Sequence, residues 1–224
     1  LLDKDAAQRF RDQALHPEAP VLRGTAQNPD IFFQAREACN KYYDALPAIV
    51  EDYMNKVNDL IGTDYKLFNY YGAADAEHII IAMGSVNETI EETIDYLNAA
   101  GGKYGLVKVR LYRPFVAEKL VEVIPESVKR ISVLDRTKEP GSLGEPLYLD
   151  VVAALKDTKF NNIPVFTGRY GLGSKDTVPA QIIAVFKNET KKRFTIGIED
   201  DVTNLSLDLE ANVDSAPAGT TACK

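Results

Sequence analysis

Apolar residues recur along this chain in two different patterns, and the change between them falls near residue 65. Before that point they return every three or four positions, as on one face of a helix. We expect helices over residues 5–15, from Asn28–Asp30 onward with Pro29 as an early helical residue, and over residues 45–61. Gly62 is expected to be the C-cap of the third helix. The second and third helices are predicted to form an αα-hairpin.

After residue 65 the apolar residues form short continuous runs that alternate with helical segments. A run such as His78–Met83 is typical of a strand that is buried on both faces of a sheet. The tetrapeptide Ser85–Glu88 fits a capping box that would begin the helix after this strand. Five strands are expected, over residues 78–83, 104–111, 128–134, 163–166 and 194–198. Four helices are expected between them, from Ser85 to Gly101–Gly102 and over residues 116–123, 148–155 and 179–188.

This alternation predicts an α/β fold with an open, mostly parallel, Rossmann-like sheet and helices on both of its faces. An N-terminal helical segment is expected over residues 1–66, before the α/β domain over residues 67–209. Residues 210–224 contain Pro217–Gly219 and little periodicity, so they are expected to be a linker.

Composition and charge exclude several classes of function. The net charge is −7, and the densest basic cluster, residues 187–193, is interrupted by Glu189, so no nucleic-acid partner is expected. The longest apolar runs are far shorter than the roughly 20 residues of a membrane span. The first residues have neither the basic start nor the apolar core of a signal peptide, so a cytoplasmic protein is expected. Both ends are expected to be internal positions of a longer polypeptide.

The residue pattern predicts neither a metal site nor a catalytic nucleophile. Cys39 and Cys223 are far apart and form no CxxC pair, so this chain alone predicts neither a zinc nor an iron–sulfur site. Such low cysteine use fits a reducing compartment. His16 and His78 are isolated, and His78 opens an apolar strand, so it is expected to be structural. No serine or cysteine is seen beside a base, and HExxH is absent, so no catalytic residue is predicted.

Charged residues gather where the predicted strands end. In open α/β sheets, ligands bind at the carboxyl ends of the strands. Four of the five expected ends carry charge, at residues 110–113, 134–137, 166–169 and 198–201. Such an edge is suited to hold a ligand or to meet another domain, and a solvated rim is the third interpretation. Asp135 and Glu139 would be placed to act as acid and base, although a local ion-pair loop is the favoured interpretation.

The segment Gly168–Thr177 is the most unusual one in the chain. Its three glycines permit close backbone approach, and Ser174 and Lys175 come before a predicted helix, where backbone N–H groups attract anions. However, the spacing fits neither GxxxxGK[ST] nor GxGxxG. One interpretation is an anion loop, and the favoured one is a tight, rigid loop used in domain packing. The anion loop would consist of Arg169, Gly171, Gly173, Ser174 and Lys175.

Several stretches, taken together and in this order, resemble the pyruvate:ferredoxin (flavodoxin) oxidoreductases. They are residues 23–30, 33–38, 109–115, 133–141, 168–175 and 198–203, and they are distributed over nearly the whole chain. The resemblance implies the end of that family's first domain followed by its second domain, which is similar to the C-terminal domain of transketolase. Residues 217–224 would then begin the third domain.

The resemblance also implies a parent enzyme that is large and homodimeric. Such enzymes oxidatively decarboxylate pyruvate to acetyl-CoA with thiamine diphosphate, magnesium and [4Fe-4S] clusters, with coenzyme A as a substrate and ferredoxin or flavodoxin as the electron acceptor. The family's thiamine and cluster ligands lie on other domains, and this chain has no GDG…N motif. No cofactor is therefore expected on this chain, which should be inactive in isolation.

The residues and the resemblance together leave two functions open. The favoured one is a non-catalytic structural and interface domain that contacts the remaining domains of the parent polypeptide. The alternative is an anion- or coenzyme A-binding module that uses the Gly171–Lys175 loop.

Overall fold

The structure is a computed structural model that describes residues 2–18, 20–21, 24 and 26–209. It divides into two compact units, Leu1–Tyr65 and Lys66–Lys224. The linker predicted over residues 210–224 lies outside the described residues, and so does Cys223.

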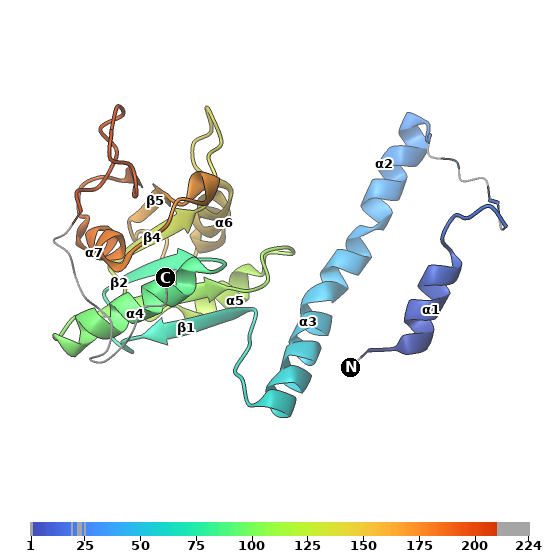
Figure 1. The fold of residues 1–224 in the computed structure, drawn as a ribbon, viewed down its shortest axis with the longest axis horizontal. Helices are drawn as coiled ribbons and strands as arrows, with labels where there is room; N and C mark the ends of the chain where they lie inside the picture. The colour runs from blue at the N-terminus through green and yellow to red at the C-terminus, as the bar shows by residue number, and fades with distance from the viewer. Residues whose placement is uncertain (1, 19, 22–23, 25, 210–224) are drawn as a thin grey trace. The chain divides into compact units, whose positions relative to one another are not determined.

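The first unit contains three helices, α1 (Lys4–Asp12), α2 (Pro29–Ala38) and α3 (Asn40–Ile61). Only Cys39 separates α2 from α3, and its backbone is itself helical, with φ −80° and ψ −13°. The two helices therefore follow one another end to end (Figure 1), and the predicted αα-hairpin is wrong because no turn of two to five residues lies between them. Gly62 is the C-cap of α3, as predicted, with φ 71° and its N–H donated to the Asn58 carbonyl.

The second unit is built on a six-stranded sheet in the order β1-β3-β2-β4-β5-β6. Strands β2 to β6 pair in parallel, and β1 pairs antiparallel with β3 at one edge. The prediction of an open, mostly parallel α/β sheet is thus confirmed, although it missed β1. The strands are β1 (Phe68–Gly72), β2 (His78–Ala82), β3 (Tyr104–Val109), β4 (Arg130–Asp135), β5 (Val165–Arg169) and β6 (Arg193–Thr195).

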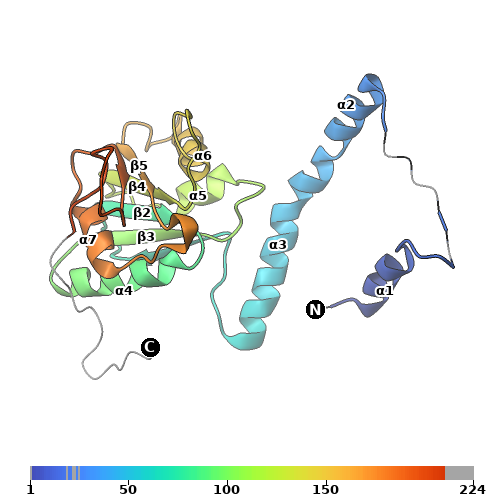
Figure 2. The ribbon, with the colours of Figure 1, turned by 45° about the horizontal axis from the view of Figure 1, so that its top comes forward.

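Helices cover both faces of this sheet. The helices are α4 (Val86–Ala99), α5 (Ala117–Val123), α6 (Pro146–Leu155) and α7 (Pro179–Lys187). Helix α4 packs beside α7 on one face, and α5 packs beside α6 on the other, as Figure 2 shows. The β2 side chains alternate between these two layers, so Ile80 joins the α4–α7 core while its neighbours point away from it. All five residues of β2 are buried, as its apolar run predicts.

The start of α4 differs from the prediction. Ser85 has helical backbone angles, φ −66° and ψ −20°, and its side chain makes no capping hydrogen bond. A capping side chain needs an extended backbone at the N-cap. Here Gly84, with φ 82°, makes the turn one residue earlier, so Ser85 already follows the helical path. The predicted capping box at Ser85–Glu88 is therefore wrong.

Candidate functional site

Asp135 lies at the carboxyl end of β4, on the predicted ligand edge, but its carboxylate serves the fold. It is 2% exposed and accepts the backbone N–H groups of Leu147 at 2.9 Å and Tyr148 at 3.1 Å. These are orphan donors at the start of α6, so Asp135 caps a helix that begins eleven residues later along the chain. Burial raises the pKa of Asp135, and the two N–H donors oppose that shift.

A buried ion pair holds the loop that follows Asp135. The Arg169 Nη1 atom lies 3.2 Å from Glu145 Oε1, and the Glu145 side chain is 2% exposed. The other carboxylate oxygen of Glu145 accepts the Glu139 N–H at 2.6 Å. Arg136 Nε donates to the Gly171 carbonyl at 2.9 Å. These contacts fix residues 136–145 against β5. They also pair the guanidinium of Arg169 with a carboxylate of the chain itself.

The glycine-rich loop, residues 168–177, forms part of the wall of a cavity of about 340 Å³ at the same edge. Arg169, Gly171 and Lys175 line this cavity together, whereas Gly173 and Ser174 do not. The Lys175 ammonium lies 3.4 Å from the exposed carboxylate of Glu199.

Helix α7 adds few N–H donors to this loop. It begins at Pro179, four residues after Lys175, and proline has no N–H. The Val178 N–H before it is accepted by Gln181 Oε1 at 3.2 Å. The residues predicted as an anion loop are therefore close in space, but the start of a helix does not supply their donors.

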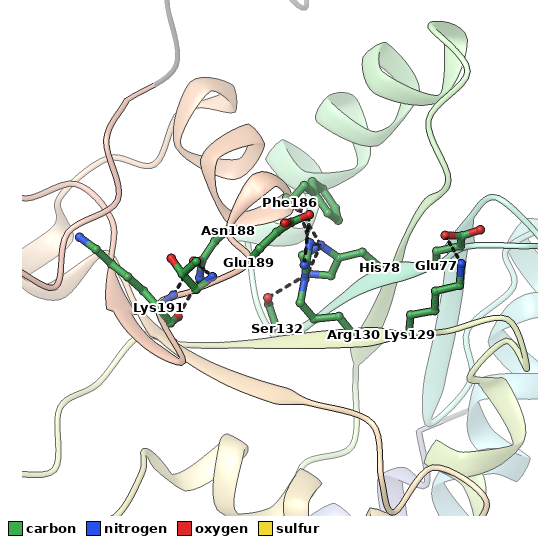
Figure 3. A network of polar contacts seen from close by, with 10 residues as sticks. Glu77, His78, Lys129, Arg130, Ser132, Phe186, Asn188, Glu189 and Lys191 are labelled. Atoms are coloured by element: carbon green, nitrogen blue, oxygen red, sulfur yellow. Dashed lines mark hydrogen bonds and ion pairs between the residues drawn. The ribbon is translucent and has the colours of Figure 1, made fainter.

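A second polar network lies at the opposite, amino edge of the sheet (Figure 3). His78 begins β2 and is 4% exposed. Its Nδ1 atom lies 2.8 Å from the Phe186 carbonyl and its Nε2 atom 3.0 Å from Ser132 Oγ. Arg130 Nη2 lies 2.9 Å from both His78 Nδ1 and the Phe186 carbonyl.

The hydrogen bonds of this network assign one tautomer to His78. A single Nδ1 atom does not donate to a carbonyl and accept from a guanidinium at once. Arg130 donates both to Nδ1 and to the Phe186 carbonyl, so Nδ1 is the acceptor, and Nε2 carries the proton and donates to Ser132 Oγ. Burial, followed by the charge of Arg130, lowers the pKa of His78 to about 3. His78 is thus a neutral core histidine, the role predicted for it.

Sequence reasoning missed Arg130 and the cleft around it. The available signal was the pair Lys129–Arg130 at the start of a buried strand, β4, with Lys103 directly before β3. These three residues come to the amino edge because β3 and β4 are both parallel to β2.

The described residues also bear on metal binding and on membrane insertion. They contain no group of three or more histidine, cysteine, aspartate or glutamate side chains placed to hold a metal ion. None of the helices in the described part of the chain is long and apolar enough to cross a membrane.

Comparisons with known proteins point to one family. Residues 76–182 match the family model "Pyruvate:ferredoxin oxidoreductase core domain II". The chain is 58% identical over 229 residues to a pyruvate-flavodoxin oxidoreductase of Enterobacter agglomerans, and the aligned region covers 100% of this chain and 19% of that protein. It is 56% identical over 228 residues to the pyruvate:ferredoxin oxidoreductase of Moorella thermoacetica, again with 100% and 19% covered. The chain therefore spans about a fifth of the length of the curated relatives it matches.

A solved structure is also similar in part. It is 2-oxoglutarate:ferredoxin oxidoreductase from Magnetococcus marinus with 2-oxoglutarate, coenzyme A and succinyl-CoA bound. The match has a TM-score of 0.39 and 19% identity, over 62% of this chain and 22% of that one.

Proposed function

The chain belongs to the pyruvate:ferredoxin oxidoreductase family, and from this we propose that it is a non-catalytic structural and interface domain of such an enzyme. The parent enzyme would be a cytoplasmic homodimer that decarboxylates pyruvate to acetyl-CoA and passes electrons to ferredoxin or flavodoxin. Residues 1–66 would end its first domain, residues 67–209 would form its second domain, and residues 210–224 would lead into the third.

The cofactors of that reaction would be bound by other domains. Each [4Fe-4S] cluster needs four cysteine thiolates, and this chain has two cysteines in all. The described residues also include no acidic or histidine cluster suited to the magnesium of thiamine diphosphate. The residues present do not fit these groups, so no step of the reaction is assigned to this chain.

The observation that carries the proposal is the exposed apolar surface of the first unit. No described residue of α1, α2 or α3 is buried. Helices of a globular protein normally bury an apolar stripe, and large exposed apolar patches mark interaction surfaces. Nine large apolar side chains of α2 and α3 are between 47% and 71% exposed: Ile31, Phe32, Phe33, Tyr42, Tyr43, Ile49, Tyr53, Leu60 and Ile61. We infer that other parts of a polypeptide about five times longer cover them.

Substitutions on α3 within the full-length polypeptide test this function. The combined change Tyr43→Gln, Ile49→Gln and Tyr53→Gln introduces a good helix former at each position but removes apolar area that would be buried. We expect the assembled dimer to be destabilised tenfold or more, about 1.4 kcal/mol, with pyruvate-dependent electron transfer falling in parallel. Light scattering after gel filtration and a turnover assay measure the two quantities.

A matched triple change on the same helix is the control. Asp52→Gln, Lys56→Gln and Asp59→Gln alter exposed polar positions of α3 and should leave assembly and turnover intact. Normal assembly and turnover of the apolar triple variant would contradict the interface role.

The cavity beside the glycine-rich loop favours a second candidate, an anion- or coenzyme A-binding module. Lys138 and Lys175 line it, and a phosphate group would compete there with the exposed Glu199 for Lys175. Calorimetric titration of this chain with coenzyme A tests the candidate, and Lys175→Ala should abolish any saturable heat. Lys156→Ala, an exposed change outside this cavity, is the control. Absence of heat at millimolar coenzyme A would eliminate this candidate and leave the interface role standing.

A further inference from the structure

The amino edge of the sheet carries a cleft of about 630 Å³ that neither proposed function uses. This volume falls within the roughly 300–1,000 Å³ of small-molecule sites. Its lining combines more cations than carboxylates with aromatic walls, in a chain whose net charge is −7. The cations are Lys103, Lys129, Arg130 and Lys187, the carboxylates are Glu77 and Glu189, and the aromatic residues are Tyr104, Phe166 and Phe186.

The two lysines at the rim have carboxylates of their own. Lys129 lies 2.7 Å from Glu77, and Lys103 lies 2.9 Å from Asp75 and 3.6 Å from Glu77. Hydrogen bonding to Lys129 lowers the pKa of Glu77, so this carboxylate stays ionised between the two lysines. The rim is therefore largely neutralised by local ion pairs.

Arg130, deeper in the cleft, has no such partner. Its side chain is 20% exposed, and the one carboxylate within 4.0 Å among the described residues is that of Glu189. Glu189 Oε1 lies 3.9 Å from Arg130 Nη1, and the Glu189 side chain is 78% exposed. The other contacts of the guanidinium are neutral, namely His78 and the Phe186 carbonyl. Burial lowers the pKa of Arg130, which is the response of a cation with too little compensating charge.

A largely buried guanidinium with one distant, exposed counter-charge is suited to receive an oxyanion, because its planar N–H groups match carboxylate and phosphate oxygens. The aromatic walls would contact the apolar part of the molecule that carries the anion. Tyr104 and Phe186 form one such wall, with ring centroids 4.6 Å apart.

We propose that this cleft binds the carboxylate or phosphate group of a small organic ligand on Arg130, and that Glu189 occupies the same position as an internal competitor. Figure 3 shows Glu189 beside Arg130 at the end of α7. The proposal is independent of the interface role, since it concerns a different unit and a different edge of the sheet from the glycine-rich loop.

Nuclear magnetic resonance titration of the 224-residue chain tests the site. The probes are inorganic phosphate and acetate, added at constant ionic strength with chloride as the balancing anion. We expect saturable, low-millimolar shifts of the backbone amide signals of Arg130 and Phe186–Glu189, and none at Gly171–Lys175. A response to phosphate alone would identify a phosphate ligand, and a response to both would identify a general oxyanion site. No saturable shift at this cleft with either probe would overturn the proposal.

A pair of matched variants separates local competition from net charge. Glu189→Gln removes the competing carboxylate and should tighten binding about two- to fivefold, the range of an exposed ion pair. Glu199→Gln removes a similarly exposed carboxylate beside Lys175 and should leave the affinity of the cleft unchanged. Equal effects of the two changes would contradict the proposal. Arg130→Gln should abolish saturable binding. If the Arg130→Gln variant fails to fold, the comparison of Glu189→Gln with Glu199→Gln still tests the proposal.

Discussion

At the scale of single residues, His78 couples the stability of the α/β unit to pH. Its pKa is lowered to about 3 in the folded chain, against about 6.5 for an exposed histidine. In the unfolded chain His78 therefore binds a proton near pH 6.5, whereas in the folded chain it binds one only near pH 3. The stabilising effect of the neutral ring is complete above pH 6.5 and is lost as the pH falls. Arg130 is the charge nearest to the ring, and it opposes protonation throughout this range.

We predict that the free energy of unfolding falls by about 2 kcal/mol between pH 7 and pH 5 through His78 alone, since each pH unit below 6.5 costs about 1.4 kcal/mol. Urea unfolding curves at the two pH values measure it. His78→Gln should be less stable at pH 7 and should lose this part of the pH dependence. His16→Gln is the control, because His16 has 49% of its side chain exposed and is the other histidine of the chain. An unchanged pH slope in His78→Gln would contradict the assignment.

At the scale of elements, the sequence predicts the buried strands well and the edge strand not at all. β2 and β4 appear as apolar runs because both of their faces are covered by helices. β1 is only partly buried and has no such run. Its place depends on Gly72, which faces Gly105 of β3, because a Cβ on Gly72 would lie 2.8 Å from the Gly105 Cα atom. A close approach between residues 33 positions apart leaves no periodic signal in the sequence.

Helix starts show the same division between local and distant causes. The sequence suggests a local cap for α4 at Ser85, but the glycine turn before it makes that cap impossible. The cap of α6 comes instead from Asp135 on β4, a contact that exists only once the strand and helix are packed. The αα-hairpin fails for a local reason, because residues 38–40 contain neither glycine nor proline and Cys39 continues the helical path.

The sites follow this division as well. The glycine-rich loop is contiguous in sequence, so its residues are recognised as a group, and Arg169, Gly171 and Lys175 line one cavity. The partner of Arg169 was missed because Glu145 lies on a neighbouring loop. The amino-edge cleft was missed for the same reason, since Arg130, Phe186 and Glu189 come from separate elements.

At the scale of the whole molecule, the two units differ in what holds them together. The described core lies in the second unit, where apolar side chains from strands and helices are fully buried on both faces of the sheet. The helices of the first unit have no buried residue, so their stability depends on helix propensity and on whatever covers their apolar side chains. In a chain that spans about a fifth of its relatives, this difference supports the proposed division into the end of one domain and a second domain.

We therefore predict that a fragment of residues 66–224 unfolds in one cooperative transition, with a free energy of unfolding within about 1 kcal/mol of the 224-residue chain. A fragment of residues 1–65 should lose its helical signal gradually on heating, because helices without tertiary packing melt without cooperativity. Circular dichroism melts and urea titrations of both fragments and of the full chain measure these quantities. Removing residues 1–65 should also reduce self-association, since the nine exposed apolar side chains leave with them. A fragment 66–224 that fails to fold would show that the first unit belongs to the same cooperative structure, and the division of the chain into a complete domain and a docking segment would then be wrong.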